Sequence, residues 1–204
     1  MLRIATILLA LLAGVTGGAG AQAPTPDSIV AGKLNYRDFS VDVSAVQSDP
    51  GFGAIKGALE HQLDIVADCG AKPEIVAFFR RQAIALTPGV QHHFGPRVGV
   101  VINPARLPPQ QPVILHELLH AYQSFVLPDG PRNADVLKYY GEARDGQLYP
   151  RGSYVLTNQM EFFAVTGSLY LWGHTDVPPG TRDTLRSRQP AYTAWLADLF
   201  GVQK

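Results

Sequence analysis

The chain has 204 residues, of which 46% are hydrophobic and 17% are charged, a composition typical of one globular domain and not of a disordered chain. Seventeen basic side chains balance seventeen acidic ones, so no excess of positive charge is present for binding nucleic acid. The single cysteine, Cys69, excludes an intramolecular disulfide, a thiolate-rich zinc site and an iron–sulfur cluster. Any bound metal must therefore be held by histidine and carboxylate side chains.

The N-terminus has the pattern of a secretory signal peptide. Arg3 precedes an apolar run over residues 4–15, which small residues follow, and the run is too short to span a bilayer as a helix. We expect cleavage after Ala21, because cleavage two residues later would leave Pro24 at the new N-terminus. The pattern predicts a signal peptide over 1–21, a secreted or periplasmic protein, and no stable membrane insertion after its removal.

Residues 22–50 mix proline, serine and aspartate with a few apolar residues and show no helical period. The turn-forming residues 48–51 end this segment. We expect an extended leader here, or an edge strand around residues 39–46, in front of one domain that covers residues 51–204.

The hydrophobic pattern from residue 54 onward predicts a mixture of helices and strands. Apolar residues recur at steps of three and four, or in short β-branched runs, between proline and glycine breaks. The predicted helices cover residues 54–67, 73–81, 112–126, 134–144, 158–172 and 190–200, and the predicted strands cover residues 83–86 and 97–102. The chain is therefore expected to be α+β, with a small mixed sheet in its N-terminal part and a mainly helical C-terminal part.

An HExxH pattern formed by His116, Glu117 and His120 falls inside the helix predicted over 112–126. A spacing of four places both imidazoles about one turn apart on the same side of the helix, where two ring nitrogens bind one Zn²⁺ at roughly 2.0–2.1 Å. Glu117 lies beside them and is positioned to take a proton from a water that the metal acidifies. The alternative is a chance occurrence of the pattern on a helix with two surface histidines. It is disfavoured, because the motif requires a helix and a helix is predicted at this position.

A catalytic zinc usually has three protein ligands and one open position, so a third ligand is needed. No histidine follows His120 closely. Glu161 is the preferred candidate, since the apolar residues that follow it at helical spacing would pack inward and carry its carboxylate with them; Glu142 is the reserve. The alternative role for Glu161 is a capping box, because Asn158 stands three residues before it.

Two segments resemble a known protein family. Ser153–Tyr154 and residues 157–164, which read Thr-Asn-Gln-Met-Glu-Phe-Phe-Ala, resemble the Ser-Tyr and Thr-Asn-x-x-Glu-Phe-Phe-Ala segments of the anthrax lethal factor catalytic domain and its relatives, in the same register. With the HExxH pattern, the resemblance implies a zincin-like fold and a gluzincin zinc metalloprotease. It implies His116, His120 and Glu161 as ligands, Glu117 as the base and Tyr154 as the residue that stabilises the transition state.

The resemblance has one departure and one further implication. Such proteases often have a carboxylate four residues after the glutamate ligand, where this chain has Val165, so support for a ligating histidine must come from elsewhere. In related zincins the strand beside the active-site helix accepts substrate as an added strand, and we expect residues 97–103 to be that strand. Without the resemblance, Tyr154 would be an ordinary loop tyrosine.

The leading hypothesis is a secreted or periplasmic zinc peptidase acting on peptide or protein substrates. One alternative is a zinc-stabilised binding or regulatory module without turnover. The presence of Glu117 and Tyr154 argues against it, because neither residue is needed to hold the metal. Another is a secreted helical domain that binds no metal. The other histidines, and the cysteine as a small buried side chain, are expected to lie outside the site. They are His61, His92, His93, His174 and Cys69.

Overall fold

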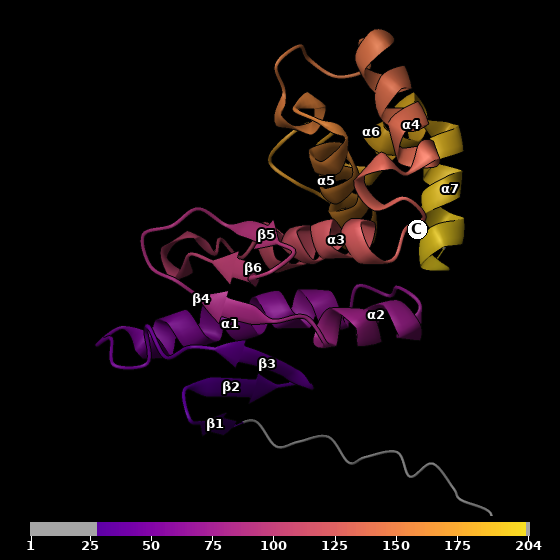
Figure 1. Cartoon of the computed structure of the whole chain (residues 1–204). Coiled ribbons are helices and arrows are strands. Elements are labelled where there is room, and N and C mark those ends of the chain that lie inside the picture. Colours follow the sequence, from indigo (N-terminus) through magenta and orange to yellow (C-terminus); the bar gives the residue numbers. More distant parts are fainter. Residues whose placement is uncertain (1–27, 203–204) are drawn as a thin grey trace, which may run out of the picture.

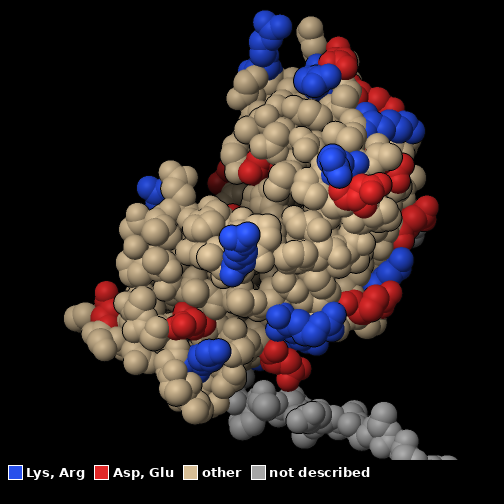
Figure 2. Space-filling view, viewed as in Figure 1, with Lys and Arg blue, Asp and Glu red and all other residues tan. Residues whose placement is uncertain are grey.

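The computed structural model describes residues 28–202 of the chain. The predicted signal peptide over 1–21 lies outside these described residues. Within them, no helix is both long and apolar enough to cross a membrane. On the face shown in Figure 2, basic and acidic side chains are interspersed and separated by larger uncharged areas, in keeping with the formal net charge of zero.

The strands form one mixed, six-stranded sheet with the order β1-β2-β3-β4-β6-β5. The N-terminal strands pair antiparallel, the β3-β4-β6 segment is parallel, and β5 returns antiparallel on β6. The strands are β1 (Ser28–Val30), β2 (Lys33–Tyr36), β3 (Phe39–Asp42), β4 (Ile84–Leu86), β5 (His93–Gly95) and β6 (Gly99–Ile102). The mixed sheet expected from the sequence is present, and it is larger than expected.

The expectation of an extended leader up to residue 50 is corrected for residues 28–42, which form three strands of this sheet. The turns that join them, Ala31–Gly32 and Arg37–Asp38, have positive φ at both residues, the geometry of a two-residue hairpin. They lack the Asn-Gly or Asp-Gly pair that usually announces such a turn. The edge strand expected around residues 39–46 is also corrected, because β3 lies inside the sheet and β1 forms the edge.

The helices follow the predicted positions with shifts of one or two residues at their ends. The predicted helices correspond to α1 (Phe52–Ala67), α2 (Pro73–Arg80), α3 (Val113–Phe125), α4 (Ala134–Asp145), α5 (Gln159–Trp172) and α7 (Pro190–Phe200). Helix α6 (Arg182–Arg188) was not predicted, because its seven residues include only one apolar side chain, Leu185, and so show no period. The described chain is therefore α+β, with a sheet in its first half and mainly helices in its second.

Helix α3 lies in the middle of the molecule, between the sheet with α1 and α2 on one side and helices α4–α7 on the other (Figure 1). Most of its side chains are therefore buried, including the polar Glu117, His120 and Gln123. Gly167 of α5 permits the close approach of the two helices, since a Cβ atom there would lie 3.1 Å from Leu119 Cδ1. Burial of this many polar groups on one helix costs free energy unless they are hydrogen-bonded, paired or bound to a metal.

Candidate metal centre

The start of α3 is fixed by a buried glutamine on α1. The Gln62 side chain, 0% exposed, donates from Nε2 to the carbonyl oxygens of Pro108 (3.1 Å) and Gln111 (2.6 Å), and its Oε1 accepts from Ile114 N–H (3.3 Å). These bonds anchor the proline-rich segment and the first turn of α3 to α1. This role of Gln62 was not predicted, because a polar side chain inside an amphipathic pattern gives no signal of what it contacts.

The start of α5 is fixed by Asn158. Its Oδ1 accepts hydrogen bonds from the backbone N–H groups of Met160 and Glu161, each at 2.9 Å, which is the usual N-cap arrangement. The Glu161 carboxylate does not reach back to the cap. It points toward α3 and lies against the two histidines of the HExxH pattern.

Three ligand-type atoms converge where α3 faces α5. His116 Nε2 and His120 Nε2 are 3.2 Å apart, and Glu161 Oε2 lies 3.2 Å from the first and 3.5 Å from the second. Atoms bonded to one tetrahedral Zn²⁺ at about 2.0–2.1 Å would be about 3.3–3.4 Å apart. The structure thus forms a possible metal-binding triad from His116, His120 and Glu161, and its two-nitrogen, one-oxygen donor set fits zinc.

The charge state of Glu161 suits a ligand. Burial by itself would raise the pKa of this carboxyl, but its close contacts with the His116 and His120 imidazoles outweigh burial and lower the pKa below its usual range. The carboxylate is therefore ionised at neutral pH and available to a cation. Glu142, the reserve candidate for the third ligand, is instead exposed on α4 and is not part of the triad.

The second ring nitrogen of His120, one of the two candidate ligand histidines, has no hydrogen bond in the described residues that would orient the ring. His120 Nδ1 is buried and has no hydrogen-bond partner among residues 28–202. A carboxylate or carbonyl usually accepts a hydrogen bond from this second nitrogen and orients the ring, and the position expected for such a carboxylate holds the buried Val165. Among residues 28–202, no hydrogen bond at Nδ1 therefore orients the His120 ring.

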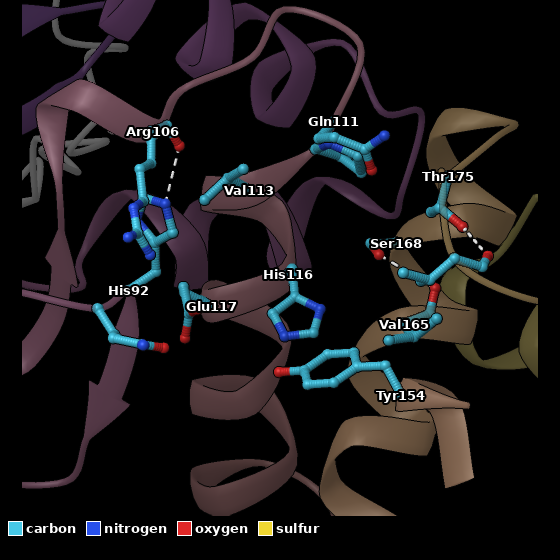
Figure 3. Close-up of a pocket in the computed structure, with 13 residues that line it drawn as sticks. His92, Arg106, Gln111, Val113, His116, Glu117, Tyr154, Val165, Ser168 and Thr175 are labelled. Atoms are coloured by element: carbon cyan, nitrogen blue, oxygen red, sulfur yellow. Dashed lines mark hydrogen bonds between the residues drawn. The ribbon is translucent and has the colours of Figure 1, made fainter. Parts of the chain in front are cut away.

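Glu117 is buried next to the triad and lines a cavity that opens beside His116 (Figure 3). Its side chain is 5% exposed, and burial raises the pKa of its carboxyl while the nearby His116 and His120 oppose this rise. A carboxylate whose pKa is raised is a better proton acceptor from water at neutral pH.

Tyr154 lies on the opposite side of His116, in the 3₁₀ turn η3 (Tyr154–Leu156) that precedes α5. The rings of Tyr154 and His116 are 6.2 Å apart, and the Tyr154 hydroxyl points into the space below His116 in Figure 3. Burial, and the nearby Glu161 carboxylate, raise the pKa of the phenol. The hydroxyl therefore keeps its proton over the whole neutral range and remains a hydrogen-bond donor.

His92, expected to lie outside the site, is in the wall of the cavity. Its Nδ1 accepts a hydrogen bond from Asn103 N–H (3.2 Å), and its Nε2 lies 2.8 Å from the Arg106 carbonyl oxygen. Since Nδ1 accepts, Nε2 must carry the proton and donate. His92 is thus neutral, and its two hydrogen bonds form a clamp that holds the turn after β6. No sequence motif indicates this role, because it depends on hydrogen bonds between loop residues.

The other side chains that were expected to lie outside the site do so. His93 is exposed on β5, and His61 contacts the Pro109 carbonyl oxygen from an exposed position. His174 lies against the Trp172 ring, 5.9 Å between centroids. Cys69 is buried at 2% exposure.

The expected substrate strand over residues 97–103 is corrected by the sheet order. Strand β6 has β4 on one side and β5 on the other, so both of its edges are already paired. The free edge on this side of the sheet belongs to β5 (His93–Gly95), which packs against α3. Strand β5 was not predicted, because three residues are too few to show the alternating pattern of a strand.

Comparison of the chain with protein-family models, with curated proteins and with solved structures finds no significant match.

Proposed function

We propose that the chain is a zinc-dependent peptidase of gluzincin type with a zincin-like fold, similar to the anthrax lethal factor catalytic-domain family. The observation that carries the proposal is the spacing of the His116, His120 and Glu161 ligand atoms, combined with Glu117 and Tyr154 on the same cavity. A metal held only for stability would need the three ligands but neither of the other two residues.

The three ligands would hold the zinc ion and leave one position open. Zinc bound in this way lowers the pKa of a water toward neutrality and polarises a carbonyl oxygen. Glu117, buried and with a raised pKa, accepts the proton of the attacking water and then returns it to the departing amine, so that the amide C–N bond breaks and a carboxylic acid and an amine form.

Tyr154 acts on the carbonyl oxygen of the substrate. Negative charge grows on this oxygen as water attacks, and the protonated phenol donates a hydrogen bond to it. Tyr154 is half exposed on the short turn before α5 and lines the same cavity as His116, which supports this role.

The free edge of β5 supports peptide or protein substrates. An extended peptide would pair with the backbone of β5 and pass over the start of α3, since strand addition needs only an unpaired edge and is independent of side-chain identity. The balanced charge of the chain does not favour nucleic acid as a partner. The N-terminal pattern of residues 1–21 supports action outside the cytoplasm, in secreted or periplasmic form.

The decisive experiment is incubation of the zinc-loaded protein with a mixed peptide library, with and without a chelator, followed by mass spectrometry of the products. Chelator-sensitive cleavage that Glu117→Gln abolishes is the expected result. Zinc binding without cleavage of any peptide would favour the alternative, a zinc-stabilised binding or regulatory module.

A further inference from the structure

Gln123 is a buried polar residue that the proposed function does not use. It lies on α3 three residues after His120, and its side chain is 0% exposed. Both polar atoms of its amide, Oε1 and Nε2, are buried and have no hydrogen-bond partner among residues 28–202. A buried amide without partners costs free energy, so packing alone does not account for a glutamine at this position.

His120 offers the matching group one helical turn away. When Nε2 of a neutral imidazole binds a metal, the ring proton is on Nδ1, which is then a hydrogen-bond donor. His120 Nδ1 is buried and has no partner among the described residues. A buried donor and a buried acceptor, both without partners, therefore lie three residues apart on the same helix.

Helix geometry brings these two side chains within reach of each other. Residues three apart on an α-helix are neighbours, with their Cβ atoms about 5–6 Å apart. Helical side chains point back toward the N-terminus, so the Gln123 side chain lies over the turn that carries His120. Rotation about the side-chain bonds of the glutamine can bring Oε1 to the ring while the backbone of α3 stays in place.

Few other acceptors are available to His120 Nδ1. Among the buried side-chain atoms without a partner in residues 28–202, the oxygen atoms are Gln123 Oε1, Ser153 Oγ and Glu161 Oε2. Glu161 Oε2 lies at the opposite ring nitrogen, 3.5 Å from His120 Nε2. Ser153 lies outside α3, in the loop before η3. Gln123 is therefore the acceptor that α3 itself supplies.

We propose that Gln123 is a positioning residue for the metal centre: when His120 Nε2 binds zinc, the Gln123 amide oxygen accepts a hydrogen bond from His120 Nδ1–H and orients the ring. The inference rests on the zinc site of the proposed function. The glutamine takes the place of the carboxylate that often supports a ligating histidine, and as a neutral acceptor it adds no negative charge to the site. Gln123 acts on the metal only through His120.

The test compares zinc affinity and metal-free stability in the same variants. Gln123→Met keeps the length of the side chain and removes the acceptor, so the Kd for zinc, measured by competition with a chelator, should rise about 10–100-fold. The melting temperature of the metal-free protein should stay the same or rise, because two unpaired polar atoms are removed. Gln123→Glu restores an acceptor and should bind zinc at least as tightly as the wild type.

Two control variants separate positioning from packing. Gln189→Met removes a buried amide that has partners, since Nε2 donates to the Tyr139 carbonyl oxygen (3.0 Å) and Oε1 accepts from the Tyr149 hydroxyl (2.8 Å). This variant should have a lower melting temperature and an unchanged Kd for zinc. Ser153→Ala removes another buried oxygen without a partner and should also leave the Kd for zinc unchanged.

A measurement on the wild type does not depend on how well a variant folds. In nuclear magnetic resonance spectra of the zinc-loaded protein with isotope-labelled histidine, the His120 Nδ1–H proton should show nuclear Overhauser contacts to the Gln123 side chain. In Gln123→Met the resonance of this proton should move upfield, because its hydrogen bond is lost.

A Kd for zinc that changes by less than about threefold in Gln123→Met, well below the usual range, would overturn the inference while the peptidase function stands. Weaker zinc binding in Ser153→Ala in its place, or absence of the Overhauser contacts, would do the same. Failure of the wild type to bind zinc would instead remove the proposed function on which the inference rests.

Discussion

Glu161 Oε2 lies 3.2 Å from His116 Nε2, although the two residues belong to different helices. Helix α3 carries the histidine and helix α5 carries the glutamate, and the two helices pack closely at Gly167. The possible metal-binding triad therefore depends on the packing of one helix pair, and substitutions at the two residues should have related effects.

His116→Ala, His120→Ala and Glu161→Ala should each abolish or strongly weaken zinc binding, because two remaining ligands rarely hold Zn²⁺ against water. Metal content of the purified variants, measured by mass spectrometry, checks this. Glu142→Ala is the control and should bind zinc as the wild type does, since Glu142 is exposed on α4. The opposite pattern, with zinc lost in Glu142→Ala and kept in Glu161→Ala, would refute the ligand assignment.

Glu117→Gln should leave zinc content unchanged and lower kcat by about 10²–10⁴-fold, the usual contribution of a positioned general base. The amide has nearly the same shape as the carboxyl but does not accept a proton from water. Zinc content and peptide hydrolysis are measured on the same preparation. Loss of zinc together with activity would show that Glu117 acts as a ligand or supports the fold.

Tyr154→Phe should lower kcat by about 10²–10³-fold, which is typical for the loss of one donor to a developing oxyanion, with little change in KM, zinc content or thermal stability. The ring packs beside His116 and remains in place, so only the hydroxyl is removed. Tyr140→Phe is a suitable control, because its hydroxyl bonds the Leu156 carbonyl oxygen on the same turn without facing the triad. A Tyr154→Phe enzyme with more than about a third of wild-type kcat would exclude the proposed role.

The His92 clamp should make stability depend on pH. Burial lowers the pKa of His92 below 6.5 and outweighs the hydrogen bond to the Arg106 carbonyl oxygen, which by itself would raise the pKa. A histidine with a lowered pKa in the folded state contributes stability that is complete above its unfolded pKa and decreases as the pH falls below it. Melting temperatures of the metal-free protein between pH 5 and pH 8 should show this loss on the acid side. His92→Gln should flatten the profile, whereas His93→Gln, at an exposed position, should not.

Gln62→Leu should destabilise the protein by about 2–4 kcal/mol, since the buried acceptors and the Ile114 N–H that Gln62 satisfies would lose their partners. Urea denaturation at fixed pH measures the change. His61→Ala is the comparison: its bond to the Pro109 carbonyl oxygen is exposed, and water replaces it at little cost. Equal stability of Gln62→Leu and the wild type would mean that the start of α3 is held by packing alone.

Elements with a clear hydrophobic period, and residues with a fixed local spacing, could be predicted from the amino-acid sequence. The helix around His116 and His120 could be predicted because apolar residues recur along it, and the spacing of four places both imidazoles on one side whatever surrounds them. Strands of three or four residues, and turns such as Ala31–Gly32, carry no period or turn signature of this kind.

Only the tertiary structure decided between the two roles of Glu161. Asn158 has the same spacing to Glu161 whether the glutamate caps its own helix or faces another one, and local sequence does not contain the distance between helices. The packing of α5 on α3 brings the carboxylate to both imidazoles, while Asn158 caps α5 without it. The free edge at β5 and the clamp at His92 depend in the same way on segments that are distant in sequence and meet only in the fold.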